Sequence, residues 1–315
     1  RHRSGGGLMI SLDDSLASTP PGSGDTKDPA PRFMDSPMFL VASVLLIFSC
    51  LCLGFLANLL VVSQLIHARD QEVLYSDFRS ELANAIAPVG QTDINGALLQ
   101  PGAAIAILEI PDIGLQEVVV EGTTSTVTQS GPGHKRDTVL PGQAGTSVIY
   151  GRQAAFGGPF GQVEILQPGM TIVATTGQGV AEYRVIGVRR PGDPIPALLQ
   201  SGEGRLTLVT AMGPRFMPTD LLRVDAELVS QVQPSPPRVI TPASMDPAEQ
   251  AMAGDPEGLV PLLLWLQVLL AVAVATVWLV LRWGKWQAWL VAAPIFFFAG
   301  VMASMSAIRL LPNLL

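Results

Sequence analysis

The chain has 315 residues, of which 48% are hydrophobic and 14% are charged, and its formal net charge is −7. This composition is too apolar for an ordinary soluble protein of this length and predicts membrane-spanning segments. The acidic balance argues against nucleic-acid binding, which usually needs a basic face. The two cysteines, Cys50 and Cys52, share one apolar run, and the three histidines have no zinc-ligand spacing. We therefore expect no disulfide, no metal site and no cofactor.

The first part of the chain predicts a tail followed by a membrane anchor. Residues 1–36 are rich in Gly, Ser, Pro and Asp and have no apolar period, which is typical of a disordered segment. Residues 37–66 carry no charge and exceed the about 20 residues that cross a bilayer. A cleaved signal peptide has a shorter apolar core, so we expect an uncleaved transmembrane helix.

A stripe of apolar residues follows this span at helical spacing and predicts that the helix continues to about Ala87. Residues 67–99 are thus expected to form a juxtamembrane helix and a linker. The stripe is expected to pack on the chain's own folded domain; a docking face for a partner is the alternative. Its members are Leu74, Phe78, Leu82 and Ile86.

Residues 100–230 predict a small β-barrel or sandwich, because short β-branched runs alternate with Gly and Pro turns. At most brief helices are expected between the strands, at 124–131, 159–166 and 194–201. Residues 231–258 are polar and rich in proline, which predicts a semi-rigid linker back to the membrane. The strand runs are AIAILEI, LQEVVVEG, TSVIYG, MTIVATT, AEYRVIGVRR, RLTLVTA and LLRVDAELV.

Two further apolar runs, 259–281 and 288–308, predict a second and a third transmembrane helix before a short tail at 309–315. The basic loop 282–287 between them is expected on the cytoplasmic side, which places the N-terminal tail there and the β-domain outside. His67 and Arg69, just outside the first span, count against this orientation. Small residues in the last two runs allow close helix packing, either within the chain or with another membrane protein.

Four stretches of the β-domain resemble sortases, the transpeptidases of Gram-positive cell surfaces, and most closely the actinobacterial, class E-like type. They occur in the family's order over roughly residues 100–230. The resemblance implies a mainly β fold, a closed barrel of about eight strands. The stretches are AILEIPDIGLQEVVVEGT, SGPGHKRDTVLPGQAGTSVIYG, GGPFGQVEILQPGMTIVAT and RLTLVTAMGP.

The resemblance also implies three catalytic groups, and each is changed in this sequence. The family's cysteine nucleophile attacks a sorting-signal peptide, but Ala211 stands in its place. The family's histidine proton shuttle is replaced by Arg152, which stays protonated. The family's arginine is replaced by Leu221; Arg223, two residues later on the same strand face, is a partial substitute.

Two residues keep alternative interpretations. His134 is expected to brace the turn of the GPGH stretch; the alternative makes it a general base for Ser147, Thr207 or Thr210. Arg152 is expected to be structural, or else to bind a carboxylate or a peptide carbonyl. The binding candidates are therefore Arg152, Arg223 and His134.

The sequence as a whole predicts a membrane-anchored pseudoenzyme, a sortase-like protein without catalysis. It would act as a binding or scaffold subunit with a membrane or cell-surface protein partner, a transporter or a surface polymer among the options. The former substrate groove is a candidate site for a peptide ligand. The alternatives are an active peptidase or transpeptidase with rewired residues and an accessory subunit of a membrane transporter.

Overall fold

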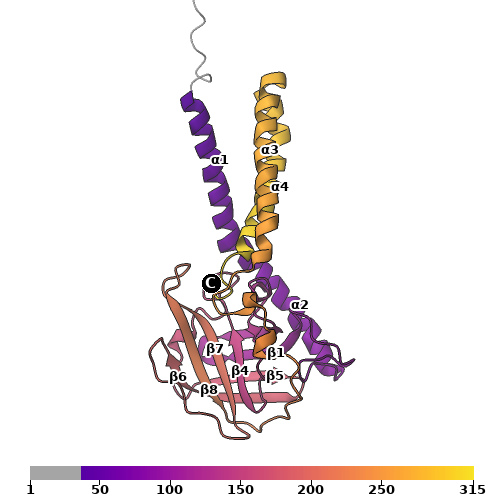
Figure 1. Cartoon of the computed structure of the whole chain (residues 1–315), viewed down its shortest axis with the longest axis vertical. Helices are drawn as coiled ribbons and strands as arrows, with labels where there is room; N and C mark the ends of the chain where they lie inside the picture. Colours follow the sequence, from indigo (N-terminus) through magenta and orange to yellow (C-terminus); the bar gives the residue numbers. More distant parts are fainter. Residues whose placement is uncertain (1–36) are drawn as a thin grey trace, which may run out of the picture. The chain divides into compact units, whose positions relative to one another are not determined.

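The computed structural model describes residues 37–315, so the tail expected at 1–36 lies outside the described residues (Figure 1). Ser49–Leu315 form one compact unit, and all contacts reported below lie within it. This unit contains a β-barrel and long apolar helices, as the sequence predicted.

Eight strands close into a barrel in the order β1-β2-β3-β4-β7-β8-β6-β5. The β2–β3 and β4–β7 pairs are parallel and the other neighbours are antiparallel. Seven strands coincide with the predicted runs; β3, only two residues long, lies in the GPGH stretch and was not predicted. The strands are β1 Ala104–Ile110, β2 Leu115–Glu121, β3 Gly133–His134, β4 Gly145–Tyr150, β5 Thr171–Thr176, β6 Gly179–Arg189, β7 Gly204–Met212 and β8 Asp220–Leu228.

The barrel interior is filled by apolar side chains that alternate along the strands. On β7, Leu206 and Leu208 point into this core. The opposite face of the same strand is also buried, at Val209 and Ala211. An outer face of a barrel is normally solvated on alternate residues, so another part of the chain must cover β7 from outside.

The first long helix runs from the apolar segment onto the barrel. Helix α1 (Pro37–Ala57) continues through a π-helical turn (Asn58–Val62) into α2 (Ser63–Ala83). The helix ends four residues before the predicted Ala87. Ala85 has a φ of 55°, a left-handed conformation that a helix does not continue.

The apolar stripe of α2 packs on the barrel, as expected (Figure 1). Phe78 is fully buried against Ile107 of β1 and Val118 of β2. The Gln71 side chain extends the ladder, because its amide both donates to the Val118 carbonyl (3.1 Å) and accepts from the Val118 N–H (2.7 Å). His67 lies 3.1 Å from a carboxylate oxygen of Glu117 and so also contacts the barrel.

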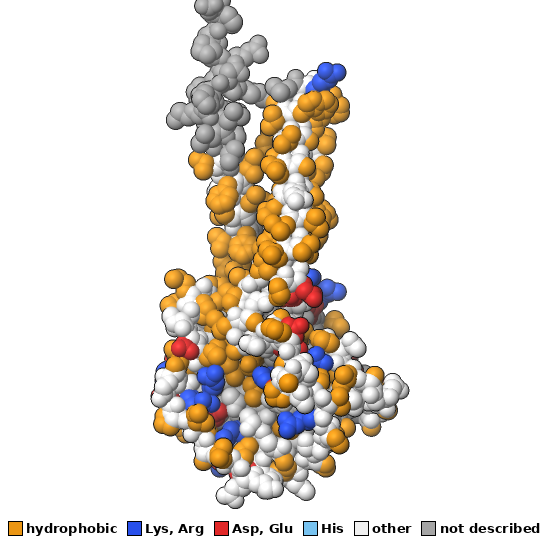
Figure 2. All heavy atoms as spheres, in the orientation of Figure 1, with side chains coloured by type: hydrophobic (Ala, Val, Ile, Leu, Met, Phe, Trp, Pro, Cys, Tyr) orange, Lys and Arg blue, Asp and Glu red, His pale blue; other side chains and the backbone are white. Residues whose placement is uncertain are grey.

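Three described helices are long and apolar enough to cross a membrane: Leu45–Ala83, Pro256–Val280 and Trp286–Arg309. Apolar side chains cover α3 (Leu259–Trp283) and α4 (Lys285–Arg309), whereas charged side chains gather on the barrel (Figure 2).

The apolar helices contact one another through small residues, the close packing that the sequence allowed. Ala299 and Ala303 of α4 pack with Leu269 of α3. The Asn58 amide of the π turn donates to the Ser304 hydroxyl of α4 (3.0 Å).

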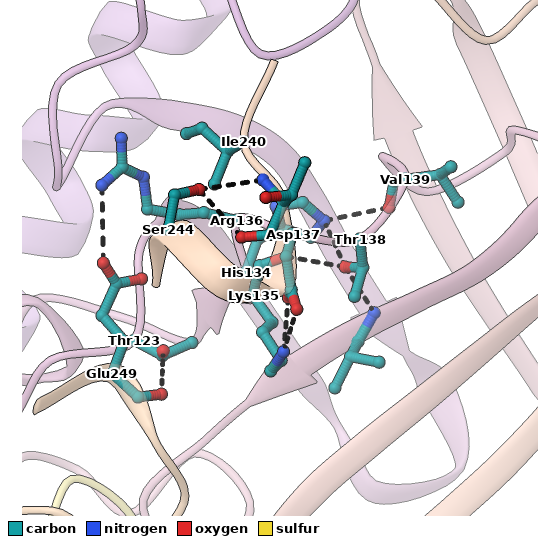
Figure 3. A network of polar contacts seen from close by, with 12 residues as sticks. Thr123, His134, Lys135, Arg136, Asp137, Thr138, Val139, Ile240, Ser244 and Glu249 are labelled. Atoms are coloured by element: carbon teal, nitrogen blue, oxygen red, sulfur yellow. Dashed lines mark hydrogen bonds and ion pairs between the residues drawn. The ribbon is translucent and has the colours of Figure 1, made fainter. Parts of the chain in front are cut away.

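The segment between β8 and α3, predicted to be a linker, is fastened to the barrel (Figure 3). Its Glu249 pairs with Arg136 at 3.4 Å, and the Glu249 carbonyl accepts from the Thr123 hydroxyl at 2.6 Å. The side-chain oxygen Oε1 of Gln91 accepts from the backbone N–H groups of Val239 and Ile240 in this segment. These contacts make the segment a strap on the barrel surface rather than a free spacer.

Two of the three places where at most brief helices were predicted contain a single turn of helix. The structure has 3-10 turns at Val127–Gln129 and Val163–Ile165, inside the first two predicted helices. Residues 194–201 form no helix, because two prolines in that stretch remove backbone donors.

Candidate functional site

The outer face of β4, β7 and β8 carries the positions that the sequence singled out. Tyr150 lies opposite Val209, and Val209 lies opposite Arg223. Ala211 lies opposite Leu221 on the same two strands. Residues directly opposite in a ladder project from one face, so these five side chains form one surface.

This surface is covered by the segment that follows α4. Leu314 has 0% exposure and packs on Tyr150, Val209 and Ala211. The strap residues Ala251 and Met252 close the same cluster from the other side. In Figure 1 the last residue, marked C, lies against the barrel. The surface is therefore covered, and we call it and the segment's seat on it the groove; Ala211 lies at its floor with 2% exposure.

Arg152, two residues after β4, is a fully buried cation at one side of this groove. Its Nη2 donates to the carbonyl and hydroxyl oxygens of Ser125 (2.7 and 2.9 Å), and its Nε donates to the Thr128 carbonyl (3.1 Å). Its Nη1 donates to the Pro312 carbonyl at 3.3 Å. Burial lowers the pKa of Arg152 to about 9, so the guanidinium keeps its charge at neutral pH.

The turn that presents Arg152 depends on a glycine. A Cβ on Gly151 would lie 2.3 Å from the Phe160 ring, so no larger residue fits without displacing that ring. The guanidinium carbon of Arg152 lies 5.1 Å from the centre of the Phe156 ring, a cation–π contact.

His134 lies in β3 and is also fully buried, but it faces different partners (Figure 3). Its Nδ1 is 2.8 Å from Glu121 Oε2, and its Nε2 is 2.9 Å from the Val139 carbonyl. Both are acceptors, and an imidazolium, which donates from both ring nitrogens, satisfies them. Nε2 also lies 3.0 Å from the Thr138 hydroxyl, which donates to the Lys135 carbonyl. Burial lowers the pKa of His134, but the attraction and hydrogen bond of Glu121 outweigh it, so the pKa is raised. This is the geometry that a bracing role predicts.

The hydroxyl candidates for a rewired enzyme are not joined to a histidine in the described residues. Thr207 donates to Asp225 at 2.8 Å, and Asp225 also accepts from Arg189 at 2.9 Å. The hydroxyls of Ser147 and Thr210 are buried and have no hydrogen-bond partner there.

Residues 108–228 match the family model described as a sortase domain. The barrel is a sortase domain. The match covers the strands that build the groove, the loop that carries Arg152, and β3, which carries His134. No significant match appears among curated proteins.

Solved sortase structures are similar to the chain as well. A sortase D5 transpeptidase of Clostridium perfringens is 23% identical, with a TM-score of 0.40, over 52% of this chain and 99% of its own. Sortase E1 of Streptomyces coelicolor is 26% identical (TM-score 0.37; 41% and 90% covered). A sortase E variant of Streptomyces avermitilis is 27% identical (TM-score 0.36; 48% and 100% covered).

The sortase domain contains no cysteine, because Cys50 and Cys52 precede it on the long helix. The position that the resemblance assigns to the nucleophile is Ala211, beneath Leu314. The sequence did not reveal that residues 310–315 fill the groove. In the sequence this segment is two pairs of leucines separated by Pro312 and Asn313, and this pattern predicted only a short tail after the last span.

Proposed function

We propose that this protein is a membrane-anchored, catalytically inactive sortase-domain protein that serves as a binding or scaffold subunit of a membrane or cell-surface assembly. The observation that carries the proposal is Ala211 at the floor of a filled groove. An alanine has no nucleophilic atom, and Leu314 occupies the space above it that an acyl group would need.

The surroundings of Ala211 support the same conclusion. Arg152 is committed to three backbone carbonyls and a hydroxyl, and a guanidinium is not a proton shuttle at neutral pH. Arg223 shares the groove face but lies opposite Val209, two residue pairs along the ladder from the Ala211–Leu221 pair.

The alternative of a rewired enzyme needs His134 beside Ser147, Thr207 or Thr210, and none of these hydroxyls contacts it in the described part of the chain. The hydroxyl that does, Thr138 at 3.0 Å, donates to the Lys135 carbonyl.

A turnover assay tests the loss of catalysis. The full chain in detergent would be incubated with fluorogenic sorting-signal peptides, with and without an amine acceptor, beside a cysteine sortase as the positive control. We expect no hydrolysis or transfer above the rate without protein. Turnover that disappears in His134→Gln or Arg223→Ala would overturn the proposal.

We propose further that the barrel lies outside the cytoplasmic membrane. The predicted loop 282–287 is reduced to Gly284 between α3 and α4, and Arg282 and Lys285 on either side of it favour the cytoplasmic side. His67, which counted against this orientation, contacts Glu117 of the barrel. Leu198 is 94% exposed, so a Leu198→Cys variant should react with a membrane-impermeant maleimide on intact cells. Labelling only after lysis would contradict this orientation.

The partner is proposed to be a protein of the membrane or cell surface. Detergent extraction after cross-linking in cells, followed by mass spectrometry of proteins captured with the full chain, distinguishes the options. A surface-polymer or pilus protein supports a scaffold role, whereas a transporter supports the accessory-subunit alternative.

A further inference from the structure

The segment after α4 contacts the barrel mainly through its backbone. The carbonyl of Leu311 accepts from the Ser125 hydroxyl (2.7 Å), and that of Asn313 accepts from the Thr128 hydroxyl (2.9 Å). Pro312, between them, accepts from Arg152 as described above.

The next two residues continue the pattern. The Leu314 carbonyl accepts from the Gln153 N–H (2.9 Å), and the Leu315 carbonyl accepts from the Ala155 N–H (3.1 Å). Five consecutive carbonyls thus each find a donor between residues 125 and 155. The segment is a turn and not a strand, because the Leu315 N–H also donates to the Pro312 carbonyl at 3.1 Å. Main-chain hydrogen bonds that hold a peptide leave selectivity to the pockets around its side chains.

Two side chains of the segment make specific contacts with the residues around it. Asn313 is fully buried, and its amide donates to the carbonyls of Thr123 (2.6 Å) and Gln250 (2.9 Å). Leu314 fills the apolar space above Ala211. An aspartate in place of Asn313 would put a carboxylate against two carbonyls, and one in place of Leu314 would bury an unpaired charge.

The strap is shaped to admit this segment. A Cβ on Gly254 would lie 2.3 Å from the Leu310 carbonyl oxygen, so the backbones approach too closely for any side chain there. The Asn313 N–H donates to the Ala253 carbonyl at 2.9 Å, and the Asp255 N–H donates to the Arg309 carbonyl at 3.0 Å.

We infer that the groove is a peptide-binding site whose resident ligand is residues 311–315 of this chain, a turn recognised through the side chains of Asn313 and Leu314. The inference rests on the proposed function, in which the groove binds rather than cleaves. The resident segment excludes other peptides and fastens α4 to the barrel. A partner peptide of the same chemistry enters only when the segment leaves.

A peptide-binding experiment tests this inference. The probe is a fluorescein-labelled peptide with the sequence of residues 309–315, RLLPNLL, and the matched control carries Leu314→Asp. Its receptors are the full chain and a variant that ends at Leu310, both in detergent. We expect the shortened variant to bind the probe and to bind the control more than about tenfold more weakly, since tenfold corresponds to about 1.4 kcal/mol. The full chain should bind neither.

Two results would overturn the inference: equal binding of the probe by the full chain, or a folded shortened variant that does not bind it. If the shortened variant does not fold, hydrogen exchange on the unaltered chain decides, because the amides of Asn313 and Leu315 donate to the Ala253 and Pro312 carbonyls and should be protected. Exchange of these amides at the rate of a free peptide would then refute the resident ligand. Cleavage of the probe by the shortened variant would refute the proposed function alone, since binding would be intact.

Discussion

The sortase domain buries two cations, Arg152 and His134, and surrounds them differently. His134 pairs with the carboxylate of Glu121, and all its hydrogen-bond partners lie between residues 121 and 139. Arg152 has no carboxylate partner in the described residues, and its donors go to oxygens of Ser125, Thr128 and Pro312. One charge is neutralised within the barrel, and the other is solvated partly by a segment 160 residues away.

This difference separates what the barrel needs from what the groove does. A histidine–carboxylate pair closed within two neighbouring strands stabilises the scaffold whether or not the groove is filled. A guanidinium bound by carbonyls and a hydroxyl has a large desolvation cost and no opposite charge to offset it. Arg152 therefore depends on the carbonyls around it, and one of these belongs to the segment that fills the groove.

Removing the charge of Arg152 should have the largest effect. Arg152→Met removes the charged donor from three buried carbonyls, although those of Ser125 and Pro312 keep a second donor in the Thr128 hydroxyl and the Leu315 N–H. At about 1.5–3 kcal/mol for a hydrogen bond to a charged group, we expect a loss on the order of 4 kcal/mol in the free energy of unfolding. Thermal unfolding of the full chain in detergent measures this loss. Arg184→Met, at an exposed position of β6, is the matched control and should change stability by less than about 0.5 kcal/mol. Equal melting temperatures of the two variants would show that the hydrogen bonds of Arg152 do not stabilise the fold.

Shortening Leu314 tests the groove half of the comparison separately from its charge. Leu314→Ala should cost about 2–3 kcal/mol, the lower part of the range for a buried leucine, because a surface segment can settle into the space. Leu198→Ala removes the same atoms at a position that is 94% exposed and should be nearly neutral. If both variants unfold at the wild-type temperature, Leu314 does not pack in the groove in solution.

The barrel was predictable from the sequence because its signals are local. Alternating β-branched runs between Gly and Pro turns reproduce seven of the strands, and uncharged runs reproduce the apolar helices. β3 escaped prediction because two residues are too short to show a period. Residues 194–201 form no helix because Pro194 and Pro196 have no backbone N–H to donate.

The contents of the groove were not predictable because they depend on contacts of long range. The residues that hold Arg152 in place, Ser125, Thr128 and Pro312, carry no motif that links them. The sequence identified Arg152 and Ala211 as changed positions through a family resemblance, but only the fold brings Leu314 onto Ala211. Likewise, the proline-rich strap has the composition of a linker, and only its partners, such as Gln91, reveal its attachment.

The charge of His134 should appear as a pH dependence. Its pKa is raised above the ordinary 6.5, so the folded state binds the proton more tightly than the unfolded state. The resulting stabilisation is complete below pH 6.5 and disappears as the pH rises through the folded-state pKa.

His134→Gln should lower stability by about 2 kcal/mol at pH 6, the size of a hydrogen bond to a charged group. The difference from wild type in melting temperature should shrink as the pH is raised. Glu121→Gln, which leaves the imidazolium without its carboxylate, is the reciprocal variant. Its difference from wild type in melting temperature should also shrink as the pH is raised. A difference that is constant from pH 6 to 9 would mean that His134 is neutral in the fold.

The smallest effect is expected at Glu249, a second buried carboxylate whose partner is only partly buried. Burial raises the pKa of Glu249 more than Arg136 lowers it, so ionisation of Glu249 opposes folding. Its contribution is therefore most favourable at low pH and declines as the pH rises through the folded-state pKa, the opposite of a carboxylate that gains from its ion pair. Glu249→Gln keeps an acceptor for Arg136 and should leave stability at pH 7 unchanged or raise it by less than about 1 kcal/mol. Unfolding curves at pH 5 and pH 8 check the sign: the variant should gain on wild type at the higher pH. A Glu249→Gln variant that loses stability relative to wild type at pH 8 would contradict this, because the charge of Glu249 would then stabilise the fold.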